Sequence, residues 1–122
     1  MRTRPLFRSA AAFNVIVGLP MLVAYPAVAR LLGLEGPPTV WFHLAAGAVL
    51  LFGWAYWQIA RDPVRNRPYV ALGIVGKLAF AGIIYGHRLA GTATTATAVL
   101  VTVDVVYALL FMSWLRANPP TG

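Results

Sequence analysis

The sequence predicts an all-α fold, a four-helix transmembrane bundle with up-down topology. Of its 122 residues, 60% are hydrophobic and only 11% are charged, whereas roughly a quarter are charged in an ordinary soluble domain. About 20 apolar residues cross the ~30 Å hydrocarbon core of a bilayer as a helix. Four stretches of the chain are this long and hold at most one charged residue each. They are 9–29, 36–60, 68–87 with Lys77, and 89–115 with Asp104.

The first helix is expected over residues 9–32. Pro20 and Pro26 should bend it, because each proline removes a hydrogen bond to the carbonyl four residues before it. The arginines before residue 9, the apolar run and the segment Ala27-Val28-Ala29 also resemble a signal peptide with its cleavage site. The apolar run is long for a signal peptide, which favours a retained helix.

The other three helices are expected over residues 40–60, 69–88 and 93–115. The connections are short, and one of them is an arginine-rich inner loop at 61–68. Short connections make neighbouring helices antiparallel. The chain is therefore predicted to be a single transmembrane domain, 1–122, with a frayed tail at 118–122.

The basic residues indicate the orientation. Ten Lys and Arg against three Asp and Glu give a net charge of +7. Arg30 and Arg88 fall on one side of the predicted membrane, and seven arginines fall on the other. Since cytoplasmic loops carry the excess of Lys and Arg, both termini are predicted to be cytoplasmic. These arginines cap helix ends and form no cationic face, so nucleic-acid binding is not expected. The seven are Arg2, Arg4, Arg8, Arg61, Arg65, Arg67 and Arg116.

Standard catalytic and cofactor signatures are absent from the sequence. There is no cysteine, which excludes disulfides, thiolate metal sites and cysteine nucleophiles. The segment around Gly76-Lys77 lacks the spacing of a P-loop, and no other nucleotide, metalloprotease or hydrolase motif occurs. With only two histidines, His43 and His87, haem ligation has little support. No metal and no cofactor are predicted.

Each predicted span carries a polar residue that is costly in hydrocarbon, and such residues indicate function. At about 1.5 Å per residue, Lys77 lies ~12 Å and Asp104 ~16 Å from the inner ends of their helices. The two are therefore expected to pair, with Asn14 joining them from the first helix. The pair is either a structural ion pair that sets the register of two helices, or the polar floor of a ligand pocket or a protonatable step on a transport route. His43 lies near the outer border, where a histidine is more often a border residue than a ligand.

Residues three and four apart share a helix face, and this spacing predicts which side chains point into the bundle. Tyr107 shares a face with Asp104, and Trp54 is expected to face inward together with His43. The candidate catalytic residues are Asp104, Lys77 and Tyr107. The candidate ligand-binding residues are Asn14, Lys77, Asp104, Tyr107 and Trp54.

Several short motifs resemble those of small bacterial four-helix membrane proteins called DoxX-like. They are Pro26 with Leu31-Leu32-Gly33-Leu34, Arg61-Asp62-Pro63 through Asn66-Arg67, Gly76-Lys77, and Asp104. The resemblance implies a four-helix topology in the bacterial inner membrane. Some DoxX-like proteins are associated with quinone-linked oxidoreductases or redox-stress membrane complexes, but the resemblance transfers no catalytic residue.

Two classes of function remain open. The first is a non-enzymatic membrane protein that binds or transports a small or lipid-like ligand, or serves as an accessory subunit of a membrane complex. The small size and the lack of catalytic motifs favour it. The second is a membrane enzyme, an isomerase or oxidoreductase, acting on a lipid, isoprenoid or quinone-like substrate with Asp104 as proton carrier. If the chain transports a ligand, a homo-oligomer is also expected. The motif Gly82-x-x-x-Gly86 is then a candidate contact between copies, and packing within the bundle is its other interpretation.

Overall fold

The computed structural model describes residues 3–120, and this part of the chain is helical without a β-strand. Four of its five helices are long and apolar enough to cross a membrane. The prediction of an all-α protein with four apolar spans is therefore confirmed. The helices are α1 (Thr3–Val23), α2 (Tyr25–Leu32), α3 (Val40–Arg61), α4 (Arg67–Leu89) and α5 (Thr95–Ala117).

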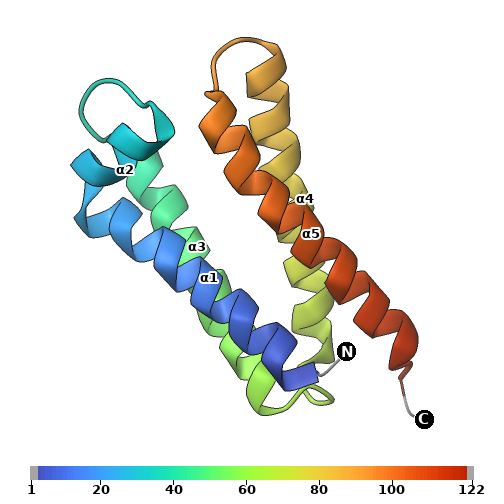
Figure 1. The fold of residues 1–122 in the computed structure, drawn as a ribbon. Helices are drawn as coiled ribbons and strands as arrows, with labels where there is room; N and C mark the ends of the chain where they lie inside the picture. The colour runs from blue at the N-terminus through green and yellow to red at the C-terminus, as the bar shows by residue number, and fades with distance from the viewer. Residues whose placement is uncertain (1–2, 121–122) are drawn as a thin grey trace.

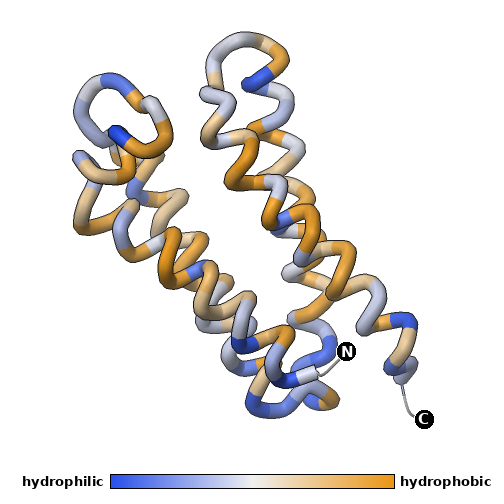
Figure 2. The backbone as a smooth tube through the Cα atoms, viewed as in Figure 1, coloured by the Kyte–Doolittle hydropathy of each residue, from blue (hydrophilic) through white to orange (hydrophobic). Residues whose placement is uncertain are grey.

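The outward faces of the long helices are apolar. Val23, Leu51, Val75 and Leu109, one from each long helix, are between 58% and 71% exposed. Figure 2 shows the hydrophilic residues gathered mainly at the two ends of the helices. A water-soluble helix would present charged side chains on that outer face, so these faces suit contact with lipid.

The long helices pack as two hairpins, α1 with α3 and α4 with α5. Figure 1 shows the hairpins diverging toward the end that holds α2 and the loop before α5. At the other end lie the loop 62–66 and both ends of the chain. The hairpins are thus packed together over only part of their length.

The hydrophobic core lies in the half of the bundle where the hairpins meet. Phe7 stacks edge-on against Trp114 with ring centroids 5.3 Å apart, and Tyr56 meets Phe111 in the same manner at 5.3 Å. Such aromatic pairs add to the energy of area burial. These contacts join α1 to α5 and α3 to α5, so the core ties the two hairpins together.

The prediction of one helix over 9–32 was wrong. The chain begins its helix earlier, at Thr3, and leaves it at Ala24 (φ −136°, ψ 46°) before α2 starts. Pro26 lies in the first turn of α2, where a missing N–H costs nothing. Pro20 stays inside α1, and its carbonyl accepts the Ala24 N–H at 2.8 Å. The two prolines therefore divide the segment into two helices.

The loop and tail boundaries also differ from the prediction. Arg61 ends α3 and Arg67 already begins α4, so the inner loop is 62–66 and not 61–68. Within the predicted frayed tail 118–122, Asn118 caps α5 by donating from its N–H and its Nδ2 to the carbonyl of Trp114. Residues 121–122 lie outside the described part of the chain.

Candidate ligand-binding site

Lys77 is the centre of a polar cluster inside the bundle. It extends from the middle of α4, and its side chain is only 4% exposed. The ammonium Nζ donates to Asp104 Oδ1 on α5 at 2.6 Å and to Asn14 Oδ1 on α1 at 3.3 Å. Since a buried charge needs a partner, Asp104 supplies the countercharge and Asn14 a further acceptor. The structure therefore brings Asn14, Lys77 and Asp104 together, and these are three of the four predicted ligand-binding residues that meet at this cluster.

Three aromatic rings surround the same ammonium group. Lys77 Nζ lies 5.6 Å from the ring centre of Phe13, 5.1 Å from that of Tyr56 and 5.3 Å from that of Tyr107. A cation within about 6 Å of an aromatic face is attracted by the ring quadrupole, more strongly where water is excluded. Because Tyr56 belongs to α3, all four long helices meet at Lys77. We refer to Phe13, Tyr56 and Tyr107 as the aromatic cage.

Further hydrogen bonds hold the cluster in place. Asn14 Nδ2 donates to the carbonyl of Val49 on α3 at 2.9 Å, while its Oδ1 faces Lys77. The Tyr107 hydroxyl donates to Ser9 Oγ on α1 at 3.0 Å. Both ends of the Asn14 amide are thus used, and the amide joins the two hairpins.

An apolar cavity of about 390 Å³ opens beside this cluster, in the half of the molecule where the hairpins diverge. Phe13 belongs both to the cavity wall and to the aromatic cage. Asp104 lies one helical turn from Leu100, the cavity residue contributed by α5. The lining residues are Phe13, Ile16, Val17, Pro20, Met21, Ala27, Val28, Leu31, Leu32 and Leu100.

Helix α2 forms one wall of the cavity through Ala27, Val28, Leu31 and Leu32. Thr94 caps α5 by accepting from the Thr97 N–H, and its hydroxyl donates to the carbonyl of Leu32 at 2.6 Å. This bond ties the last residue of α2 to the start of α5. The break at Ala24 therefore lets α2 turn back and complete a wall that a straight helix would leave open.

Trp54 lies away from the Lys77 cluster. Its side chain is 55% exposed and lines a second, polar pocket of about 480 Å³ next to the loop 62–66. The interior residues of α3 are instead Ala46, Gly53, Tyr56, Ile59 and Ala60. The predicted inward face of the second span was therefore wrong, and Trp54 does not join Asn14, Lys77, Asp104 and Tyr107.

Comparison with known proteins gives one partial similarity. No family model matches the chain, and no solved structure matches it. The chain is similar to the phosphatidylglycerol–prolipoprotein diacylglyceryl transferase of Beijerinckia indica subsp. indica, with 41% identity over 78 residues. The similarity covers 58% of this chain and 28% of that one. The chain thus spans under a third of the length of the curated relative it matches.

Tyr56 and Phe13 belong to the site but were not predicted. A signal for Tyr56 is present in the sequence, because Ala46, Gly53 and Ala60 recur every seven residues and mark a face of small side chains. Tyr56 lies on this face, next to Gly53, and Asn14 Cβ would be only 3.1 Å from a Cβ added at Gly53. Nothing in the sequence alone distinguishes Phe13 from the other aromatic residues of the first span.

The Tyr56 hydroxyl is buried without a hydrogen-bond partner in the described residues. Tyr56→Phe should therefore raise the stability in detergent by about 1 kcal/mol, because an unpaired buried polar group costs free energy. Thermal unfolding measures the change. Tyr85→Phe is the control, because the Tyr85 hydroxyl bonds Thr102 Oγ1 at 2.7 Å and its removal should give no gain. A loss of stability in Tyr56→Phe contradicts this interpretation.

Proposed function

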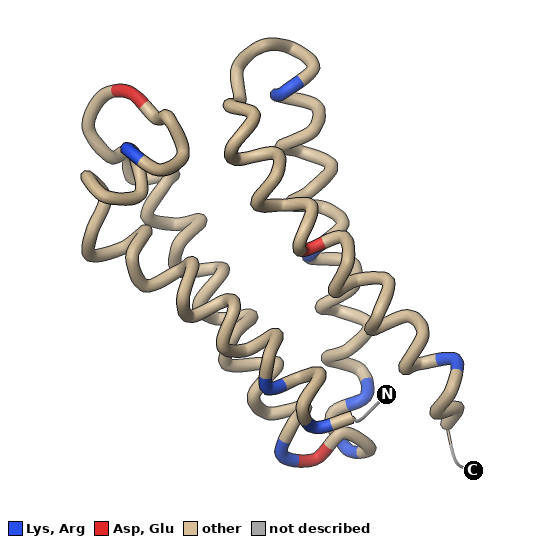
Figure 3. Tube along the Cα trace, viewed as in Figure 1, with Lys and Arg blue, Asp and Glu red and all other residues tan. Residues whose placement is uncertain are grey.

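We propose that the chain is a multi-pass protein of the bacterial inner membrane, crossing it in up-down order with both termini cytoplasmic. The distribution of charge supports this orientation. Arg30 and Arg88 are the basic residues at one end of the described chain, and six arginines lie toward the other (Figure 3). The excess of positive charge marks the cytoplasmic side. The resemblance to DoxX-like proteins agrees with this location. The six are Arg4, Arg8, Arg61, Arg65, Arg67 and Arg116.

Its function, in this proposal, is to bind one lipid-like molecule between the hairpins. The observation that carries the proposal is the apolar cavity, which reaches the Lys77 cluster through the shared residue Phe13. Small-molecule sites are concave and mostly apolar, with a few polar groups that fix orientation. An acyl or isoprenoid chain would fill the cavity, and its polar end would face Asp104 and Tyr107.

Two further observations favour a lipid over a polar solute. Every residue that lines the cavity is apolar, so a hydrated solute would lose its hydrogen bonds there without replacement. The partially similar transferase is named for phosphatidylglycerol, a membrane lipid. A carrier of lipids and an accessory subunit that holds one would both use this site.

A membrane enzyme is the second candidate. The Asp104 side chain is 20% exposed, against 4% for Lys77, so the carboxylate is the more accessible member of the pair. A carboxylate reached by a bound lipid could carry a proton, with Lys77 and Tyr107 as further catalytic residues. Mass spectrometry of the bound lipid distinguishes the two functions, because an enzyme would hold or release a chemically altered molecule.

Filling the cavity tests the binding proposal. Leu100→Trp places a large ring in the cavity, whereas Leu109→Trp places the same ring on the outward face of the same helix. Native mass spectrometry of the detergent-extracted protein should show one retained lipid in the wild type and in Leu109→Trp. In Leu100→Trp, lipid retention should fall about tenfold or more, as expected when a cavity is filled. Equal retention in both variants contradicts the proposal.

A further inference from the structure

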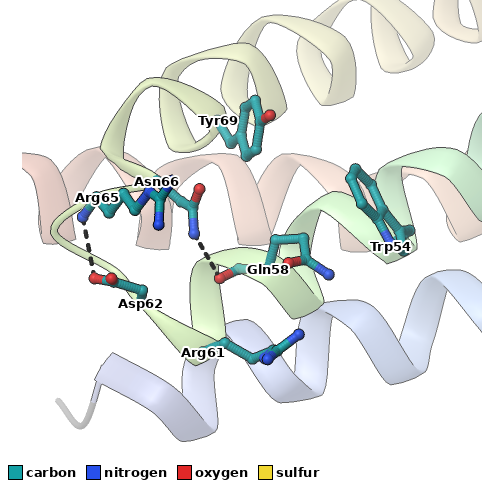
Figure 4. Close-up of a pocket in the computed structure, with 7 residues that line it drawn as sticks. All are labelled: Trp54, Gln58, Arg61, Asp62, Arg65, Asn66 and Tyr69. Carbon is teal, nitrogen blue, oxygen red and sulfur yellow. Dashed lines mark hydrogen bonds between the residues drawn. The ribbon is translucent and has the colours of Figure 1, made fainter.

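A second pocket, at the opposite end of the α1 and α3 hairpin, carries chemistry that the apolar cavity lacks. This polar pocket lies between the end of α3 and the start of α4, beside the loop 62–66, and has a volume of about 480 Å³. Figure 4 shows Tyr69 on α4 facing across it toward Trp54 and Gln58 on α3. Its lining residues are Trp54, Gln58, Arg61, Asp62, Arg65, Asn66 and Tyr69.

The guanidinium groups of this pocket, those of Arg61 and Arg65, are not bound by other residues of the described chain. Arg67, the neighbouring arginine, donates from Nη2 to the carbonyl of Leu115 and from Nε to that of Asn118. By contrast, within residues 3–120 the side chains of Arg61 and Arg65 form neither a hydrogen bond nor an ion pair with another residue. Arg65 uses only its backbone N–H, which donates to Asp62 Oδ1 at 3.2 Å.

The charges of the lining residues indicate which kind of ligand the polar pocket can bind. Two guanidinium groups and the carboxylate of Asp62 leave the pocket one net positive charge. Guanidinium groups bind phosphate oxygens through paired N–H donors. The side chains of Gln58 and Tyr69 supply further polar groups, and neither forms a hydrogen bond to another side chain of residues 3–120. One excess positive charge suits a phosphate group that carries one negative charge.

The residues on α3 also suit a lipid. Trp54, Gln58 and Arg61 are four and three residues apart and therefore share one helix face. They run from an apolar ring through an amide to a guanidinium as the helix approaches its end. This order matches the order of acyl chain, glycerol and phosphate in a phospholipid, and Trp and Arg are both enriched at membrane interfaces.

We propose that this polar pocket binds a singly charged phosphate group, supplied either by the headgroup of an anionic phospholipid or by free phosphate. The proposal does not depend on the apolar cavity, because the two pockets share no residue. The readout is the preference for phosphatidylglycerol over diacylglycerol, which has the same acyl chains but no phosphate, and an apolar cavity does not create this preference.

The test is native mass spectrometry of the full chain in detergent, titrated with phosphatidylglycerol or with diacylglycerol, which lacks the phosphate. The wild type should prefer phosphatidylglycerol, and the double variant Arg61→Gln/Arg65→Gln should lose that preference by about a hundredfold. Two surface charges outside a site would account for only about twenty-five-fold, at about fivefold each. Arg116→Gln is the control, because it removes an exposed arginine from the same end of the molecule but outside the pocket. It should lower the preference by about fivefold at most, the effect of one surface charge.

The proposal is overturned if the double variant keeps the wild-type preference, or if Arg116→Gln lowers it as much as the double variant does. Inorganic phosphate, added at millimolar concentration, identifies the source. Displacement of phosphatidylglycerol by inorganic phosphate assigns the pocket to free phosphate, and the absence of displacement assigns it to the lipid headgroup. Both results support the phosphate site itself.

Discussion

Lys77→Met is expected to lower the free energy of unfolding in detergent by about 3 to 5 kcal/mol, the cost of breaking a buried ion pair by removing one partner. Methionine retains most of the side-chain volume but leaves the Asp104 carboxylate without its cation and Asn14 Oδ1 without a donor. It also removes the charge that three aromatic rings surround. Unfolding by a denaturing detergent, followed by circular dichroism, measures the loss.

The matched control is the double variant Lys77→Met/Asp104→Leu. Replacing both members of a buried pair by apolar groups is often nearly neutral, so most of the lost stability should return. If Lys77→Met alone is as stable as the wild type, the ion pair does not stabilise the packing of α4 against α5 as described. The folded double variant also separates structure from function: a site that uses Asp104 for its ligand loses lipid retention, whereas a purely structural pair keeps it.

Gly73→Ala should lower stability by about 2 kcal/mol, within the range expected when a methyl group is forced into a packed core. A Cβ added at Gly73 would lie 2.7 Å from Cε1 of Tyr56. Tyr56 is fully buried, and its ring cannot move without disturbing the contact with Lys77. The backbone of α4 must therefore shift away from α3. Thermal unfolding in the same detergent measures the effect.

Gly82 provides the comparison on the same helix. A Cβ at Gly82 meets nothing within 4 Å, and alanine is a better helix former than glycine. Gly82→Ala should therefore leave stability unchanged or raise it slightly. An equal loss of stability in Gly73→Ala and Gly82→Ala would contradict this account. The cause would then not be contact with Tyr56, because a Cβ at Gly82 meets no neighbour. The open surface around Gly82 and Gly86 is also where the predicted oligomer contact would lie.

The location of the polar cluster could be predicted because hydrocarbon penalises polar groups so strongly. Lys77 and Asp104 each stand alone in an apolar span, and the rise per residue of a helix places them at similar depth. The position of Asn14 in the cluster could be predicted in the same way, because it is a costly polar residue in the first apolar span. No detailed knowledge of packing was needed, since a buried charge must find its partner.

The faces of α3 could not be predicted by the same rule. In a membrane, both the interior and the outer surface are apolar, so hydrophobic periodicity does not tell them apart. Trp54 was therefore assigned to the interior, although it lies on the outside, and Tyr56 was overlooked. Residue size carries the missing information, because helices approach closely at Gly53 and Ala60.

The divergence of the two hairpins was also beyond sequence reasoning. It depends on where α2 turns at Ala24 and on how Thr94 ties Leu32 to α5. These contacts join residues about 60 positions apart, and neither helix alone specifies them. The apolar cavity results from this arrangement, and Phe13 is the residue that it shares with the aromatic cage.

Photolabelling with a phosphatidylglycerol that carries a diazirine at the end of one acyl chain tests the proposed lipid site most directly. After irradiation, mass spectrometry of proteolytic fragments identifies the labelled residues. We expect labelling concentrated on the half-buried cavity residues Val17, Met21 and Val28, and lost in Leu100→Trp but not in Leu109→Trp. Labelling confined to outward residues such as Leu51 and Val75, and unchanged in Leu100→Trp, would contradict a lipid site between the hairpins.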